Sequence, residues 1–151
     1  MLAVGEMAPD FAIGMVNGSL RNLSSLRGHP VIVFFFPKAN TTGCTVETRG
    51  FAERYPRFQQ SGVEVVGVSV DSAETQASFA EKCGSRFPMV GDHSKEIARK
   101  YGVLGLLGIA KRVTFFVDAE GRVQDVVEGM LPARHLRASE RWTETASAKT
   151  P

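Results

Sequence analysis

Hydrophobic and polar positions are arranged along the chain in a way that predicts three main strands. The segments 31–36, 63–70 and 113–117 are rich in the β-branched and aromatic residues that are typical of strands. The first is apolar throughout, as expected for a strand covered on both faces by helices, so we place it in the middle of a sheet. Two β-type runs on either side of residues 118–121 predict a hairpin with a glycine in its connection.

Helical patterns fill the segments between these strands. Apolar side chains recur at helical spacing over 51–58, although Pro56 predicts that this helix kinks or ends near Tyr55. A short helix is predicted over 94–101. The expected order of elements is therefore β-α-β-α-α-β-β-α, a mixed sheet flanked by helices.

A second helix is predicted to open at Asp71–Ser72. Asp71 and Glu74 stand in capping-box spacing, which is a signature of a helix N-terminus. The pattern continues to about Cys83, where Gly84 is expected to end the helix.

The two ends of the chain differ from its middle. Glycines and prolines punctuate the region before residue 20, which we expect to be looser. From about Ala138 the composition shifts toward Ala, Ser, Thr, Glu and Lys, and we expect a disordered tail over about 146–151. A length of 151 residues predicts one domain, 1–151.

Composition and charge narrow the function classes. A net charge of +2, from 18 basic and 16 acidic residues, gives no strong field and does not suggest nucleic acid. No apolar run reaches the roughly 20 residues that cross a bilayer, and the first residues do not resemble a signal peptide, so we expect a cytoplasmic protein without a membrane partner. Two cysteines and three scattered histidines do not indicate a metal site, and we expect no cofactor.

Candidate chemistry gathers at the segment FFFPKANTTGC, residues 34–44, which follows the predicted central strand. Reactive groups in open α/β sheets collect beyond the carboxyl ends of such strands, where loop tips are accessible. Pro37 ends strand pairing, and Thr41 and Thr42 can supply N-cap hydroxyls. Cys44 would then lie in the first turn of a helix, where unpaired backbone N–H groups favour a thiolate.

The charges around Cys44 compete. Glu47 lies one turn further along and would by itself oppose ionisation of the thiol. A cation must outweigh this repulsion. Arg49 is close in sequence, but Arg112 is the better candidate because it begins a strand that could neighbour the central one.

The segment Pro37-x-x-x-Thr41-x-x-Cys44 resembles the active-site motif of peroxiredoxins, which are thiol peroxidases with a thioredoxin-like fold. In detail the chain is similar to the Q-type, bacterioferritin comigratory protein-like subfamily over about residues 5–127. Further matching segments are Gly5-x-x-Ala8-Pro9-Asp10-Phe11, Phe87-Pro88, Tyr101-Gly102-Val103 and Arg112-Val-Thr114-Phe115. There are two departures from that pattern. Thr42 replaces a usual proline, and Arg49 stands where many members carry a resolving cysteine.

The resemblance implies a fold and a set of roles. The fold would be α/β and thioredoxin-like, with a central mixed β-sheet flanked by helices and an N-terminal β-hairpin extension. Cys44 would be the peroxidatic thiol, which attacks a hydroperoxide and becomes a sulfenic acid. Thr41 would orient the peroxide, Arg112 would stabilise thiolate and leaving group, and Pro37 would shield the pocket. The implied partners are a hydroperoxide and thioredoxin or glutaredoxin as reductant, with a monomer favoured and a weak dimer as the alternative.

Cys83 has two interpretations. It follows Phe79 by four residues and shares its helix face, so it could be an inert core thiol. The resemblance implies instead that Cys83 forms a disulfide with Cys44, as in one subset of Q-type proteins. That bond would require local unwinding, because a disulfide needs Cα atoms within about 7 Å. In a one-cysteine mechanism an external thiol would attack the sulfenic acid directly.

Three other functions are weaker alternatives. A cysteine phosphatase needs five residues between its cysteine and arginine, whereas four separate Cys44 from Arg49. A dithiol reductase would need a second cysteine where Glu47 stands. A non-catalytic binding module on the same fold would not consume peroxide.

Overall fold

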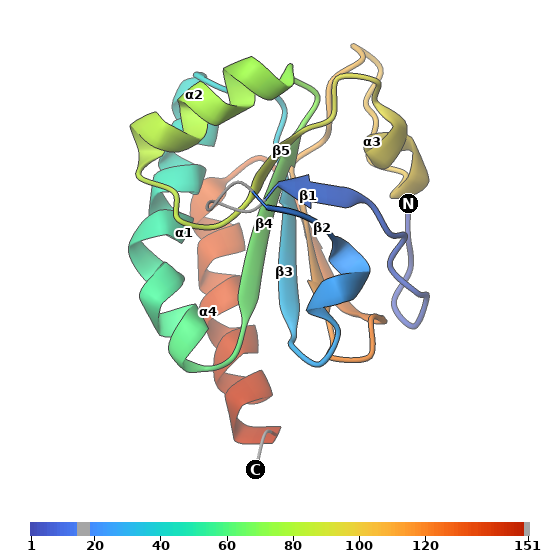
Figure 1. The fold of residues 1–151 in the computed structure, drawn as a ribbon, viewed down its shortest axis with the longest axis vertical. Coiled ribbons are helices and arrows are strands. Elements are labelled where there is room, and N and C mark those ends of the chain that lie inside the picture. Colours follow the sequence, from blue (N-terminus) through green and yellow to red (C-terminus); the bar gives the residue numbers. More distant parts are fainter. Residues whose placement is uncertain (15–18, 150–151) are drawn as a thin grey trace.

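A five-stranded mixed sheet forms the centre of the molecule (Figure 1). The computed structural model describes residues 1–14 and 19–149. The strands, in spatial order, are β5 (Met89–Gly91), β4 (Glu64–Ser69), β3 (Val31–Phe35), β6 (Val113–Val117) and β7 (Val123–Glu128). Strand β3 pairs in parallel with β4 and antiparallel with β6. The central position predicted for the all-apolar strand is confirmed, and all five of its residues are buried.

Strand β5 was absent from the predicted order. It has only three residues, all partly buried, and so shows neither alternation nor a long apolar run. It forms a strand because it pairs with β4, although its own sequence lacks a strand pattern. The hairpin predicted around residues 118–121 is confirmed as β6 and β7, which pair antiparallel.

An N-terminal hairpin lies beside the central sheet. Strand β1 (Ala12–Gly14) pairs antiparallel with β2 (Leu20–Asn22) in a separate two-stranded sheet, which confirms the expected extension. A short 3₁₀ helix, η1 (Leu23–Leu26), follows. Residues 15–18, part of the region expected to be looser, lie outside the described residues.

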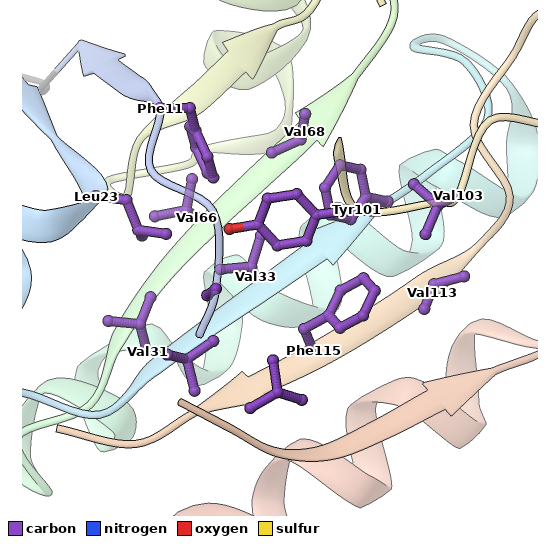
Figure 2. Close-up of a cluster of buried hydrophobic side chains, with 14 of the residues drawn as sticks. Phe11, Leu23, Val31, Val33, Val66, Val68, Tyr101, Val103, Val113 and Phe115 are labelled. Atoms are coloured by element: carbon purple, nitrogen blue, oxygen red, sulfur yellow. The ribbon is translucent and has the colours of Figure 1, made fainter. Parts of the chain in front are cut away.

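Two hydrophobic clusters cover opposite faces of the sheet, because side chains alternate along β3. Val31, Val33 and Phe35 join one cluster, together with Tyr101 and Phe115 (Figure 2). The rings of Tyr101 and Phe115 meet edge to face, with 5.3 Å between their centroids.

The other cluster lies under the helices α1 (Thr42–Gln60), α2 (Ala73–Cys83) and α4 (Pro132–Lys149). It takes the alternate β3 side chains Ile32 and Phe34, and it includes both cysteines, Cys44 and Cys83. The rings of Phe34 and Phe51 stack with 4.3 Å between centroids, which fixes helix α1 against the sheet.

Helix α1 (Thr42–Gln60) is longer than predicted. Of the two effects predicted for Pro56, a kink or an end near Tyr55, the end is wrong, because the helix continues through the proline. Tyr55 and Phe58 are buried on either side of Pro56, so packing outweighs the loss of one backbone hydrogen bond.

Helix α2 (Ala73–Cys83) ends as predicted, with Gly84 in the left-handed conformation at φ 71°. Its N-cap is Ser72, whose hydroxyl accepts from the backbone N–H of Thr75. The capping box predicted for Asp71 is wrong. The Asp71 carboxylate instead accepts from the backbone N–H of Ala39, which ties the loop after β3 to the start of α2.

The last two helices are α3 (Glu96–Lys100) and α4 (Pro132–Lys149). Helix α4 lies against α1 (Figure 1), and Gly50 makes this approach possible, because a Cβ there would meet Leu136 at 2.5 Å. The tail expected to be disordered from about residue 146 instead continues α4 to Lys149, and residues 150–151 lie outside the described part. Within the described residues, none of the helices has the length and apolar character needed to span a membrane.

Candidate active site

The sheet register brings two distant segments to one edge. Phe35 at the end of β3 lies opposite Val113 at the start of β6. Arg112, which precedes Val113, therefore lies beyond the carboxyl end of β3, where the chain enters α1. The register explains how residues 44 and 112 become neighbours.

Cys44 is the third residue of α1, and its side chain turns inward. The residue is 1% exposed, so the expectation of an accessible thiol at a loop tip is wrong. The first turn of the helix directs the sulfur toward the sheet rather than toward solvent. Both cysteines are free thiols.

The threonines before Cys44 do not cap the helix with their hydroxyls. Thr41 is the N-cap residue, but its hydroxyl donates to the backbone carbonyl of Lys38, at 2.8 Å. Its own carbonyl accepts from the N–H of Thr45, at 2.9 Å. The predicted hydroxyl caps are therefore wrong. The N–H groups of the first turn receive no side-chain cap from Thr41.

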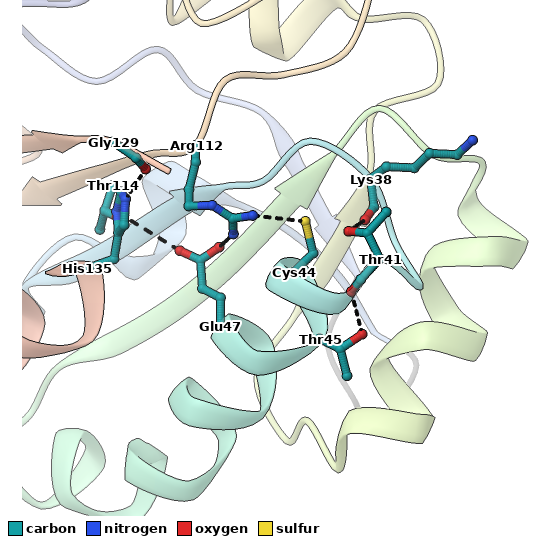
Figure 3. Close-up of polar contacts among 9 residues, drawn as sticks. All are labelled: Lys38, Thr41, Cys44, Thr45, Glu47, Arg112, Thr114, Gly129 and His135. Atoms are coloured by element: carbon teal, nitrogen blue, oxygen red, sulfur yellow. Dashed lines mark hydrogen bonds and ion pairs between the residues drawn. The ribbon is translucent and has the colours of Figure 1, made fainter. Parts of the chain in front are cut away.

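Arg112 links Cys44 and Glu47 (Figure 3). Its Nη2 donates to Cys44 Sγ at 3.5 Å, and its Nη1 donates to Glu47 Oε1 at 2.5 Å. Arg112 is 5% exposed, and Glu47 is fully buried. The guanidinium also passes close to Gly43, where a Cβ would lie 3.0 Å from Nη2. A cation thus faces the sulfur from outside the helix, as the sequence predicted for Arg112 rather than Arg49.

Glu47 is more than the simple repulsive charge that the sequence suggested. Burial raises the pKa of Glu47 from its ordinary value of 4.5 to about 7, although the ion pair with Arg112 opposes that rise. Its second oxygen, Oε2, has no hydrogen-bond partner among the described residues. Near pH 7 the Glu47 carboxyl can therefore be either charged or neutral.

His135 completes the polar group and was missed by sequence reasoning. It comes from α4 and is fully buried, with Nδ1 4.0 Å from Glu47 Oε2. Its Nε2 lies 2.7 Å from the carbonyl of Gly129, and its Nδ1 lies 2.8 Å from the hydroxyl of Thr114. His135 lies 91 positions after Cys44 in the chain, and no motif around it predicts that the two residues belong to one site.

The surroundings of His135 favour a neutral ring at neutral pH. Because a carbonyl oxygen only accepts, Nε2 carries a hydrogen and donates it to Gly129, and in the neutral ring Nδ1 accepts from the Thr114 hydroxyl. Burial lowers the pKa of His135, and the positive charges of Arg112 and Arg134 lower it further.

An apolar cleft opens beside the guanidinium. Pro37 and Arg112 line it together with Leu106, Leu107 and Met130, and its volume is about 540 Å³. Those last three side chains are largely exposed. The cleft therefore offers a hydrophobic approach to the region of Pro37 and Arg112.

Cys83 ends α2 and is 6% exposed. Burial raises the pKa of Cys83, while a hydrogen bond and the positive charge from Arg49 oppose that rise. Arg49 therefore lies against Cys83, not Cys44. In the described ranges 1–14 and 19–149, no group of three or more His, Cys, Asp or Glu residues could hold a metal ion.

Known proteins resemble this chain in sequence. The model of the AhpC/TSA family matches residues 4–126. Peroxiredoxin Bcp of Escherichia coli K12 is 31% identical over 148 residues, covering 93% of this chain and 95% of the relative. The chloroplastic peroxiredoxin Q of Sedum lineare is 34% identical over 135 residues, covering 87% and 73%.

Solved structures show the same fold. Peroxidoxin BcpB from Mycobacterium tuberculosis superposes with a TM-score of 0.85 and 32% identity, and the match covers 100% of both chains. A peroxiredoxin Q structure from Xanthomonas campestris gives a TM-score of 0.81 at 28% identity, covering 91% of each chain. The chain therefore belongs to the AhpC/TSA family and is a thiol-dependent peroxidase of the peroxiredoxin class.

Proposed function

We propose that Cys44 is the peroxidatic thiol. The observation that carries this proposal is the contact between Arg112 Nη2 and Cys44 Sγ, 3.5 Å long, at the first turn of α1. A guanidinium against a cysteine sulfur at the start of a helix is the setting in which cysteines react as thiolates. The thiolate attacks the terminal oxygen of a hydroperoxide, the O–O bond breaks, and Cys44 becomes a sulfenic acid while the remaining oxygen leaves.

Three neighbours have proposed roles in this step. The Thr41 hydroxyl donates to Lys38, which leaves its oxygen lone pairs free to accept a hydrogen bond from the peroxide. Arg112 stabilises the charge that grows on the departing oxygen. Pro37 lines the cleft and shields the pocket.

Hydrogen peroxide and organic hydroperoxides are the proposed substrates. The cleft lined by Leu106, Leu107 and Met130 would bury the apolar part of an organic hydroperoxide. A solved relative, the bacterioferritin comigratory protein of Xanthomonas campestris, is described in connection with alkyl peroxide reduction, and it is 27% identical to this chain. Because Cys44 is buried, the approach of either peroxide requires the side chains over the sulfur to move.

Cys83 is the proposed resolving cysteine. It belongs to the same buried cluster as Cys44 and occupies the last residue of α2, where a helix frays most easily. The hydrogen bond from Arg49 favours its thiolate form. The alternative, in which Cys83 is inert and an external thiol reduces the sulfenic acid, is favoured by the burial that raises the pKa of Cys83.

Mass spectrometry after one equivalent of hydrogen peroxide separates these routes. We expect the wild-type protein to contain a Cys44–Cys83 linkage, and Cys83→Ser to retain a sulfenic acid at Cys44. Cys44→Ser should consume no peroxide. A persistent sulfenic acid in the wild type, with Cys83 still free, would establish the one-cysteine route, and peroxide consumption by Cys44→Ser would exclude Cys44 as the reacting thiol.

The reductant and setting are also proposals. Peroxiredoxins in general use thioredoxin-type reductants, and we propose thioredoxin or glutaredoxin for this chain. A monomer in the cytoplasm stays a prediction, which size-exclusion chromatography and cell fractionation would test. Turnover with each purified reductant would distinguish thioredoxin from glutaredoxin.

A further inference from the structure

One cation faces two acidic groups at the centre of the site. Arg112 donates through Nη2 to Cys44 and through Nη1 to Glu47 (Figure 3). Cys44 is 1% exposed, Glu47 0% and Arg112 5%. Water therefore screens none of these three groups effectively.

His135 adds no second positive charge. Burial lowers the pKa of His135, so the ring that faces Glu47 from α4 is neutral at neutral pH, with Nε2 donating to the Gly129 carbonyl and Nδ1 able to accept from Thr114. Arg134 and Arg112 both oppose protonation of that ring. Among the described residues that contact Glu47 through a salt bridge, Arg112, which lies just before β6, is then the only charged partner.

Charge balance among Arg112, Cys44 and Glu47 favours a single proton on the two acidic groups, carried by either Cys44 or Glu47. With both Cys44 and Glu47 ionised, the three groups would carry a net charge of −1 in a low-dielectric interior, which is costly. Two neutral arrangements exist. Either Cys44 is a thiol beside an ionised Glu47, or Cys44 is a thiolate beside a protonated Glu47.

The geometry accommodates a proton on Glu47. Oε1 accepts from Arg112, and a carboxylic acid can still accept there through its carbonyl oxygen. Oε2 has no hydrogen-bond partner among the described residues and can bear the proton without breaking an existing bond. The raised pKa of Glu47 agrees with this placement.

We propose that Glu47 is a proton reservoir, which takes up a proton when Cys44 ionises and releases it when the thiolate is oxidised. This inference rests on the proposed peroxidatic role of Cys44. An ionised Glu47 would oppose formation of the Cys44 thiolate by charge repulsion, whereas a Glu47 that takes up a proton accommodates it.

The oxidation step then balances within the site. The Cys44 thiolate and a hydroperoxide ROOH give a sulfenic acid and an alkoxide RO⁻, with sulfur oxidised and the peroxide reduced. Loss of the thiolate charge leaves Arg112 paired with Glu47 alone, so Glu47 gives up its proton. That proton converts RO⁻ to ROH, whichever path it follows. No net proton is taken from solvent.

Proton counting tests the proposal. Reduced Cys83→Ser protein and the double variant Cys83→Ser/Glu47→Gln would be mixed with one equivalent of hydrogen peroxide in weak buffer with a pH indicator, near pH 7. Sulfenic acid would be counted by mass spectrometry. We expect no proton uptake with Glu47 present, and uptake of about one proton per sulfenic acid in the double variant, whose glutamine has no proton to release.

Uptake of one proton with Glu47 present, or no uptake in the double variant, would overturn the proposal. Failure of Cys44 to form any sulfenic acid would instead refute the proposed function. An infrared difference spectrum of the Cys83→Ser protein, oxidised minus reduced, gives a second test that needs no change at Glu47. A protonated-carboxyl band should disappear on oxidation, and its persistence or absence in both states would contradict the proposal.

Discussion

Gly43 determines how closely Arg112 can approach the sulfur. A Cβ at this position would lie 3.0 Å from Nη2, tighter than ordinary contact, and the guanidinium is held on its other side by Glu47. We expect Gly43→Ala to displace the guanidinium and slow oxidation of Cys44 by about tenfold, since small misplacements of reacting groups cost large rate factors. Rapid mixing with hydrogen peroxide would measure this.

The thermal unfolding midpoint supplies the control for Gly43→Ala. Alanine is a better helix former than glycine, so the variant should be no less stable than the wild type. A slower reaction that accompanies a large loss of stability would point to general damage rather than to a displaced guanidinium.

Thr41 tests the proposed orientation of the peroxide. Thr41→Val removes the hydroxyl that now donates to Lys38, whereas Thr41→Ser keeps it. We expect Thr41→Val to lower the rate of Cys44 oxidation about tenfold or more, the value of one well-placed hydrogen bond, and Thr41→Ser to stay close to wild type. Equal rates for the two variants would show that the hydroxyl does not act on the substrate.

At the residue scale, the sequence predicted the contacts between residues that are close together in the chain. Pro37, Thr41 and Cys44 lie within one loop and helix start, so their neighbourhood follows from local structure. Arg112 could be predicted only by assuming that its strand lies next to the central one. The contacts of His135 and the burial of Glu47 depend on how α4 packs against the sheet, which no local pattern in the chain reveals.

At the scale of helices and strands, tertiary packing explains why the prediction for α1 failed. Pro56 did not end α1, because buried side chains hold the helix on both sides of it. The last helix of the predicted order is present as α4, whose residues Leu136 and Trp142 pack against the cluster that contains Cys44. In α1, tertiary contacts thus outweighed the helix-breaking residue.

The contact between α1 and α4 gives a prediction at this scale. Gly50→Ala would place a methyl group 2.5 Å from Leu136 Cδ1, so α4 must shift or Leu136 must change its rotamer. We expect the free energy of unfolding to fall by about 1–3 kcal/mol, as for other overpacked cores. Denaturant unfolding would measure it. Ser78→Ala, at an exposed position of α2, is the control and should leave stability nearly unchanged.

For the whole molecule, Glu47 makes stability depend on pH. Its pKa in the folded state is about 7 against an ordinary 4.5, so between these values the folded protein binds more protons than the unfolded chain. The contribution of Glu47 to stability is therefore complete below about pH 4.5 and is lost as pH rises through about 7. His135, with its lowered pKa, acts in the opposite direction below its ordinary value of 6.5.

Comparison with Glu47→Gln isolates this contribution, since other titrating groups cancel in the difference. We expect the stability of Glu47→Gln relative to wild type to increase by up to about 3 kcal/mol between pH 4.5 and 7. Denaturant unfolding at several pH values would measure the difference. A difference that does not vary with pH would show that Glu47 titrates normally.

The activation of Cys44 by Arg112 is the central claim, and one rate constant tests it most directly. Rapid mixing of hydrogen peroxide with the reduced protein measures oxidation of Cys44 in the wild type and in Arg112→Lys, which keeps the charge but cannot hold Cys44 and Glu47 with one planar group. We predict that Arg112→Lys slows this step by roughly 10²-fold or more at unchanged fold. An Arg112→Lys protein that folds normally and reacts at the wild-type rate would contradict the account.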